Sequence, residues 1–306
     1  MKYSIAFWIG FHVFLVIFLA LDLLVFQKKR KLSNLSSSWF WSAIWISVAL
    51  VFNGCIYLLE GKEDALLFFT GYLVEKSLSI DNLFVFLMIF SSLKIQARQQ
   101  LKILYLGIFG ALILRLSLIL IGVSILSNYA WMYYVMGAFL CFTGLQFLMD
   151  TGKEKKLEDN LIFRFISRYL PVSFTASSST FWVRKKNKIY LTSAMVALIL
   201  VEISDVIFAL DSIPAVLAIT TDPFLVYTSN VFAILGLRSL YFIISYYKDK
   251  LKFFSYGLAG ILLFIGGKMI ISHFVVIHTG ISLGVIFLIL LLTVLASSKR
   301  KLNSRS

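Results

Sequence analysis

Long apolar stretches separated by short polar ones make up almost the whole chain. A helix needs about 20 mostly apolar residues to cross the hydrocarbon core of a bilayer. Nine stretches meet this requirement: residues 4–26, 39–59, 65–93, 103–126, 130–149, 189–218, 224–247, 253–276 and 280–297. Hydrophobic residues account for 60% of the 306 positions. The pattern predicts an all-α polytopic membrane protein with about nine transmembrane helices in one membrane domain, residues 1–306.

The net charge of +14 is placed in a way that predicts topology. Lys and Arg gather in alternate connections, at 28–31, 94–102, 150–188, 248–252 and after residue 298. Basic connections stay in the cytoplasm, so the N-terminus is expected outside and the C-terminus in the cytoplasm. The same placement argues against a nucleic-acid partner, and the expected surroundings are the lipid bilayer.

One connection, 150–188, is long, and it is predicted to be a basic cytoplasmic loop. Within it, residues 161–170 carry basic side chains four apart among apolar ones, which suits a helix lying in the membrane interface. A solvated loop without a role of its own is the alternative. Cys55 and Cys141 lie in different apolar spans and predict neither a disulfide nor a metal site.

Acidic residues interrupt two of the apolar spans. A charge at membrane depth costs at least about 2.5–3.5 kcal/mol, so such residues usually face a partner, a cavity or a transport path. In each span two acids stand six residues apart, and the second precedes a small polar residue. The candidate ligands in the two spans are Glu75, Asp81, Asn82, Glu202, Asp205, Asp211 and Ser212.

The two acidic spans begin segments that resemble each other. Phe109–Arg115 in the fourth span matches Phe232–Arg238 in the seventh, and 142–146 in the fifth matches 264–268 in the eighth. Residues 65–149 and 189–276 therefore predict an inverted repeat of three helices each. Transporters with such repeats bind their substrate near the middle of the membrane, between the repeats.

Opposed directions of the two acidic spans predict the depth of each acid. Glu75 is expected with Asp211 on an outer tier, and Asp81 with Asp205 on an inner tier. Six helical residues separate the tiers by about 9 Å. Glu202 lies one turn from Asp205 and joins the inner tier.

Oxygen atoms dominate this expected site. Pro214 is expected to kink its helix and free the Leu210 carbonyl, which would join the carboxylates. All-oxygen sites suit magnesium, calcium or manganese. Basic residues in the spans can balance the acids, and a purely structural ion-pair network is the alternative. These charge-balancing residues are Lys76, Arg115, Arg238 and Lys268.

Three motifs, at 75–86, 204–216 and 229–238, resemble the signature motifs of the TerC/Alx family of membrane proteins, named for tellurium resistance and grouped with LysE-like exporters. The resemblance implies efflux of manganese across the bacterial cytoplasmic (inner) membrane, with manganese as the transported ion and no cofactor. It also implies that the family's membrane acids correspond to Glu75, Asp81, Glu202, Asp205 and Asp211.

Two other functions stay open at this point. The LysE grouping suggests export of a cationic amino acid. Alternatively, the protein could be a non-transport partner that supports other membrane proteins, with its acids structural. No nucleophile–base pair, phosphate loop or cofactor motif is present in the sequence, so an enzyme is not expected.

Overall fold

The computed structural model describes residues 3–28, 35–129, 131–149, 172–173, 180–185, 188–247, 253–271, 275 and 277–303. Within these ranges the chain forms ten helices and one small sheet. The helices are α1 (Ile5–Lys28), α2 (Leu35–Glu60), α3 (Lys62–Ser92), α4 (Ala97–Asn128), α5 (Met132–Met149), α7 (Ser193–Leu217), α8 (Pro223–Leu235), α9 (Leu237–Tyr247), α10 (Phe254–Ile271) and α11 (Thr279–Asn303). The strands are β1 (Val172–Ser173), β2 (Trp182–Lys185) and β3 (Lys188–Thr192).

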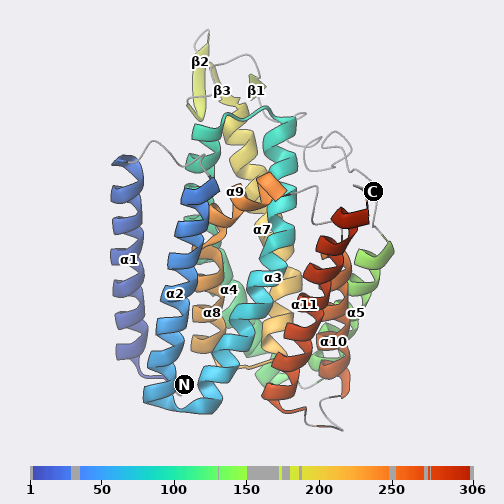
Figure 1. Ribbon diagram of the computed structural model, residues 1–306. Helices are drawn as coiled ribbons and strands as arrows, with labels where there is room; N and C mark the ends of the chain where they lie inside the picture. The colour runs from blue at the N-terminus through green and yellow to red at the C-terminus, as the bar shows by residue number, and fades with distance from the viewer. Residues whose placement is uncertain are drawn as a thin grey trace.

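Each predicted span coincides with a helix, or with the bent pair α8 and α9. Five of the described helices are long and apolar enough to cross a membrane, and the bent pair makes six. Helices α1 and α10 contain apolar segments of fewer than 18 residues, and α3 carries charges along its length. The all-helical membrane fold is therefore confirmed, while the count of nine crossings stays a prediction. The start of α1 and the end of α11 lie at opposite ends of the bundle (Figure 1).

Local sequence explains where the central helices begin. Gly61 joins α2 to α3 with φ of 97°, a left-handed conformation that favours glycine. Glu63 and Asp64 then lie in the first turn of α3, where the helix dipole favours negative charge. Asp222 caps α8, accepting hydrogen bonds from the backbone N–H groups of Phe224 and Leu225 at 2.9 and 3.1 Å.

The small sheet was not predicted from the sequence. Its strand order is β1–β3–β2, with β3 parallel to β1 and antiparallel to β2. Strand β3 leads directly into α7 and takes the first four residues of the predicted span 189–218. Figure 1 shows the sheet projecting from one end of the bundle, which we call the sheet end. The predicted interface helix at 161–170 lies outside the described residues.

Pro214 does not end its helix, and the break lies in a different span. Helix α7 continues through Pro214 and ends at Leu217, so the kink expected at Pro214 stays a prediction. The break lies in the next span, where α8 ends at Leu235 and α9 begins at Leu237 with a bend of 51°.

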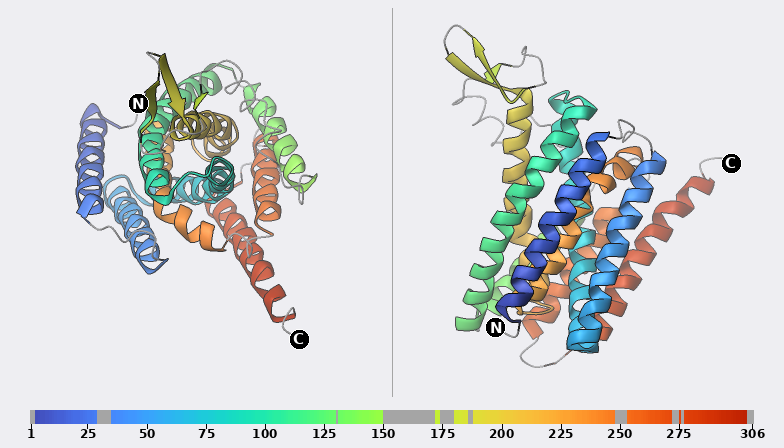
Figure 2. Two further views of the ribbon diagram at one scale, coloured as in Figure 1. Left: turned by 90° about the horizontal axis from the view of Figure 1, so that it is seen from above. Right: turned by 90° about the vertical axis from the view of Figure 1, so that its left-hand side faces the viewer.

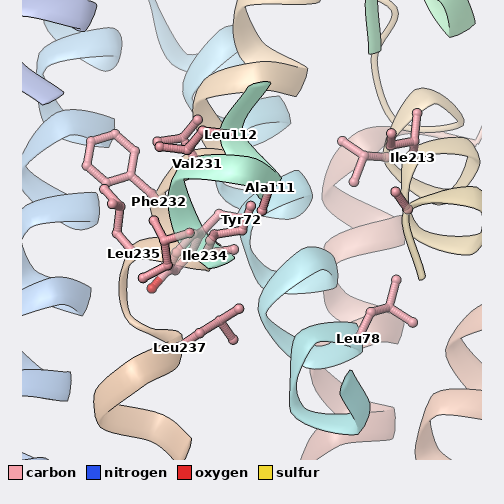
Figure 3. Packing of buried hydrophobic residues seen from close by; sticks show 14 of the residues in the cluster. Tyr72, Leu78, Ala111, Leu112, Ile213, Val231, Phe232, Ile234, Leu235 and Leu237 are labelled. Carbon is pink, nitrogen blue, oxygen red and sulfur yellow. The ribbon is translucent and has the colours of Figure 1, made fainter. Parts of the chain in front are cut away.

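Helices α3, α4, α7 and α8 surround the centre of the bundle (Figure 2). Helix α3 packs on α8 and α9, α4 packs on α7, and α5 packs on α10. The expected repeat would exchange the first two of these contacts and map the third onto itself. In Figure 3, Val231, Ile234 and Leu235 of α8 lie beside Ala111 of α4 and Tyr72 of α3. The packing thus agrees with a two-fold arrangement, although the repeat itself stays a prediction.

Glycines set the distance between α5 and α10. A Cβ at Gly137 would lie 2.9 Å from the Gly266 carbonyl oxygen, and one at Gly266 would lie 2.7 Å from the Gly137 carbonyl oxygen. Small residues allow membrane helices to approach closely enough for backbone contact. This pair of helices therefore depends on the absence of side chains at two matched positions.

Candidate functional site

Arg115 of α4 lies at the centre of the buried charges. Its Nε and Nη2 donate to the two carboxylate oxygens of Asp205 on α7, at 3.2 and 2.9 Å. Its Nη1 donates to Glu75 on α3 and, at 3.1 Å, to the side-chain carbonyl of Asn230 on α8. One guanidinium therefore connects four helices, including two from each predicted repeat.

Burial makes these contacts costly to break. Glu75, Arg115 and Asn230 are at most 1% exposed, and Asp205 is 5% exposed. Removing one partner of a buried ion pair leaves an uncompensated charge and typically costs about 3–5 kcal/mol. Asn230 was not among the predicted site residues. Its signal was present, because it is a polar residue inside an apolar span.

The contacts pair the acids differently from the two-tier prediction. The structure joins Glu75 to Asp205 through the arginine, whereas Asp211 accepts a hydrogen bond from the Thr143 hydroxyl of α5 at 3.2 Å. The backbone of Asp81 belongs to α3, but its side chain lies outside the described part of the structure. Its expected contact with Asp205 stays a prediction. Asn82 is buried, with 4% of its surface exposed.

The carboxylate of Glu202 lies against Gly110 of α4, in space that the side chain of any other residue would fill. A Cβ on Gly110 would lie 2.4 Å from both carboxylate oxygens of Glu202. The carboxylate is half-buried and makes no ion pair with any residue that the structure describes. Like Asp211, it is therefore an acid of the site without an ion-pair partner among the described residues.

A cavity of about 20 Å³ adjoins Glu202. A water molecule needs at least about 10–15 Å³, so the space admits one water-sized occupant. Glu202, Asp205 and Arg238 are its charged lining residues, and the rest of the lining is apolar or glycine. Arg238 also lies 4.2 Å over the ring of Tyr105, a cation–π contact on the α4 side.

Several buried oxygens near these residues accept no hydrogen bond from a described residue. They are Oε2 of Glu75 and the hydroxyl oxygens of Ser79 and Ser212. Ser79 lies one turn from Glu75 on α3, and Ser212 lies two turns from Asp205 on α7, so both share a helix face with an acid. Buried polar atoms without partners are uncommon in folded proteins, and these are available as ligands.

The two lysines of the predicted charge balance make no ion pair with an acid whose side chain the structure describes. Lys76 donates instead to the Ala233 carbonyl oxygen of α8, at 3.1 Å. Lys268 is half-buried on α10 and makes no ion pair within the part of the chain that the structure describes. Arg115, in contrast, contacts Glu75 and Asp205 directly.

No group of three His, Cys, Asp or Glu side chains converges on one point among the described residues. The expected ligand set is instead distributed between the Arg115 network and the Glu202 cavity. Both cysteines are free, Cys55 on α2 and Cys141 on α5.

Comparison with known proteins shows the family. The model of the integral membrane protein TerC family matches residues 60–305. The chain belongs to this family. An uncharacterized membrane protein of Myxococcus xanthus is 43% identical over 290 residues, covering 95% of this chain and 91% of that protein. No solved structure matches the chain.

Two further relatives are similar along nearly their full length. A protein of Escherichia coli K12 named "Putative membrane-bound redox modulator Alx" is 44% identical over 296 residues, covering 94% of this chain and 92% of that protein. An uncharacterized membrane protein of Rickettsia bellii is 35% identical over 294 residues, covering 96% of this chain and 97% of that protein. The chain is thus an integral multi-pass membrane protein of the TerC family.

Proposed function

We propose that this TerC-family protein exports divalent metal cations, with manganese as the substrate, from the cytoplasm through the buried carboxylates. The observation that carries the proposal is the Glu202 carboxylate. It lies against Gly110 without an ion-pair partner among the described residues and borders a cavity shared with Asp205. An uncompensated acid inside a membrane is costly unless a cation or a proton neutralises it.

The size of the cavity favours an ion over an amino acid. Sites for small molecules usually enclose about 300–1,000 Å³, whereas the space beside Glu202 is about 20 Å³. A fully hydrated divalent ion is also too large for it. On this proposal the cation loses most of its water as it enters, and carboxylate and hydroxyl oxygens replace that water.

The oxygen ligands available in the site suit a hard cation. Carboxylates and neutral oxygens bind manganese and magnesium, whereas thiols and imidazoles favour zinc and copper. Glu75 Oε2 and the Ser212 hydroxyl add two buried acceptors that no described donor uses. We place Glu202 at the cytoplasmic entrance, because it lies nearer the sheet end than Asp205 along α7 and that end is the predicted cytoplasmic one.

The test is manganese transport by the purified protein in liposomes that contain a manganese-sensitive dye. Glu202→Gln is the decisive variant, since it removes one charge and breaks no ion pair with a described residue. We expect it to reduce manganese flux at least 10-fold. Glu63→Gln is the matched control, because this exposed acid lies in the first turn of α3, outside the cavity.

Other outcomes separate the alternatives. Competition by lysine or arginine would indicate a cationic amino-acid exporter. Absence of any flux with correctly folded protein would favour the membrane-partner function. Equal flux in Glu202→Gln and Glu63→Gln would contradict the proposed role of the cavity even if manganese is transported.

A further inference from the structure

The break between α8 and α9 lies inside the bundle and is occupied by a side chain from another helix. Helix α8 ends at Leu235, and the chain turns by 51° before α9. The last turn of a helix leaves carbonyl groups without intrahelical partners, and the helix dipole makes this end negative. Such an end, buried in a membrane protein, needs a donor or a cation.

Lys76 of α3 supplies both. Its Nζ donates to the carbonyl oxygen of Ala233, in the last turn of α8, at 3.1 Å. A Cβ on Gly236 would lie only 2.5 Å from the same Nζ. The ammonium group therefore fits into the bend itself, at a place where the chain has no side chain.

The neighbouring residue on α3 points to a different partner. Glu75 contacts Arg115 of α4, whereas Lys76 contacts α8. Lys76 makes no ion pair with a carboxylate within the described ranges. Its charge is therefore directed at a helix end and not at the acid network.

In membrane transporters with broken helices, unwound carbonyls and the C-terminal ends of half-helices coordinate sodium ions or protons. Here a lysine ammonium takes that place. We propose that Lys76 is a tethered cation that fills a monovalent-cation site at the end of α8. The native protein consequently binds no sodium or potassium ion there, and removing the ammonium creates a site for a small monovalent cation.

This inference goes beyond the proposed function and does not rest on it, because the broken helix and its lysine are present whatever the protein transports. The test therefore measures stability and cation binding, and no transport. A failure of one proposal would leave the other standing.

The experiment is thermal unfolding of the purified full-length protein in lipid nanodiscs. Wild type and Lys76→Ala are compared in choline, sodium, potassium and methylammonium chloride at constant ionic strength. We expect the wild-type Tm to be the same in all four salts. We expect Lys76→Ala to unfold about 3 °C lower in choline. One of the small cations should restore at least half of the lost Tm, and the Tm should level off as the concentration of that cation rises.

Two further variants separate a cation site from general damage. Lys76→Gln keeps a donor for Ala233 but fills the space without charge, so its Tm should not respond to any cation. Gly236→Ala keeps the lysine but places a methyl group where Nζ lies, so it should lower the Tm without cation rescue. Gly267→Ala is the control, because a Cβ there meets nothing within 4 Å.

Three results would overturn the inference. One is a Lys76→Ala protein whose Tm is as high as that of wild type in choline or is insensitive to all three small cations. Another is a wild-type Tm that rises with sodium or potassium as much as that of the variant. The third is Gly236→Ala with wild-type stability, which also decides the matter if Lys76→Ala cannot be purified.

Discussion

Replacing Gly110 by alanine tests whether the position of the Glu202 carboxylate against α4 matters for transport. The new Cβ would lie 2.4 Å from both carboxylate oxygens and 2.6 Å from Cδ. Carbon and oxygen normally approach to about 3.3 Å, so the carboxylate has to move by about 1 Å. Because it ends a flexible side chain, it can swing away without displacing the backbone of α4.

Activity should therefore fall while stability stays nearly unchanged. A misplacement of about 1 Å can lower the rate of a positioned reaction about 100-fold, and we expect a loss of manganese flux of that order. The free energy of unfolding should change little. The cost of displacing the carboxylate is offset by the preference of a helix for alanine over glycine, which is about 1 kcal/mol. The assay is flux into dye-loaded liposomes, with the Tm measured on the same preparation.

Other glycines of the chain provide a graded control. A Cβ on Gly107 would meet Val201 at 3.3 Å and Glu202 at 3.8 Å, whereas one on Gly54 would meet nothing within 4 Å. Flux should decrease in the order Gly54→Ala, Gly107→Ala, Gly110→Ala. In a Glu202→Gln background, Gly110→Ala should have little further effect, since both changes act on one group. Equal flux in Gly110→Ala and Gly54→Ala would show that transport does not depend on the position of the Glu202 carboxylate beside Gly110.

Three further predictions follow from the packing and the topology. Arg115→Met should lower the free energy of unfolding by about 3–5 kcal/mol, measured by chemical denaturation, because two buried carboxylates lose their cation; wild-type stability would contradict this. Gly266→Ala should cost about 1–3 kcal/mol by forcing α5 and α10 apart, whereas adjacent Gly267→Ala should be neutral in the same assay. A reporter fused after Ser306 should be active only in the cytoplasm, and activity outside would reverse the predicted orientation.

Much of the helical framework could be predicted from hydropathy, because a bilayer imposes the same length and apolarity on every crossing. The sheet could not be predicted in this way, since β2 lies in a basic stretch outside the spans and four of the five residues of β3 were counted in the apolar span 189–218. The span 224–247 contains no proline. Its break at Gly236 was therefore missed, because the group that occupies the bend comes from Lys76, 160 residues earlier in the chain.

The depth of the acids was better predicted than their partners. Gly71 of α3 lies against Val216 of α7. Four residues further along each antiparallel helix, Glu75 comes to about the depth of Ser212, beside Asp211. This agrees with the expected outer tier. Depth alone does not fix which way a side chain points, and here Glu75 contacts Arg115 while Asp211 turns to Thr143.

A single arginine that spans both tiers has a consequence for the proposed transport. Asp205 faces the cavity beside Glu202, yet both of its oxygens accept hydrogen bonds from Arg115. A divalent cation that reaches Glu202 can use Asp205 as a ligand only if the guanidinium releases at least one of those oxygens. The same guanidinium holds Glu75, so its displacement by the cation would also free an acid on the outer tier. If the protein transports cations as proposed, entry of the cation at the inner tier would thereby be coupled, through competition with one buried charge, to release of the next carboxylate on the path outward.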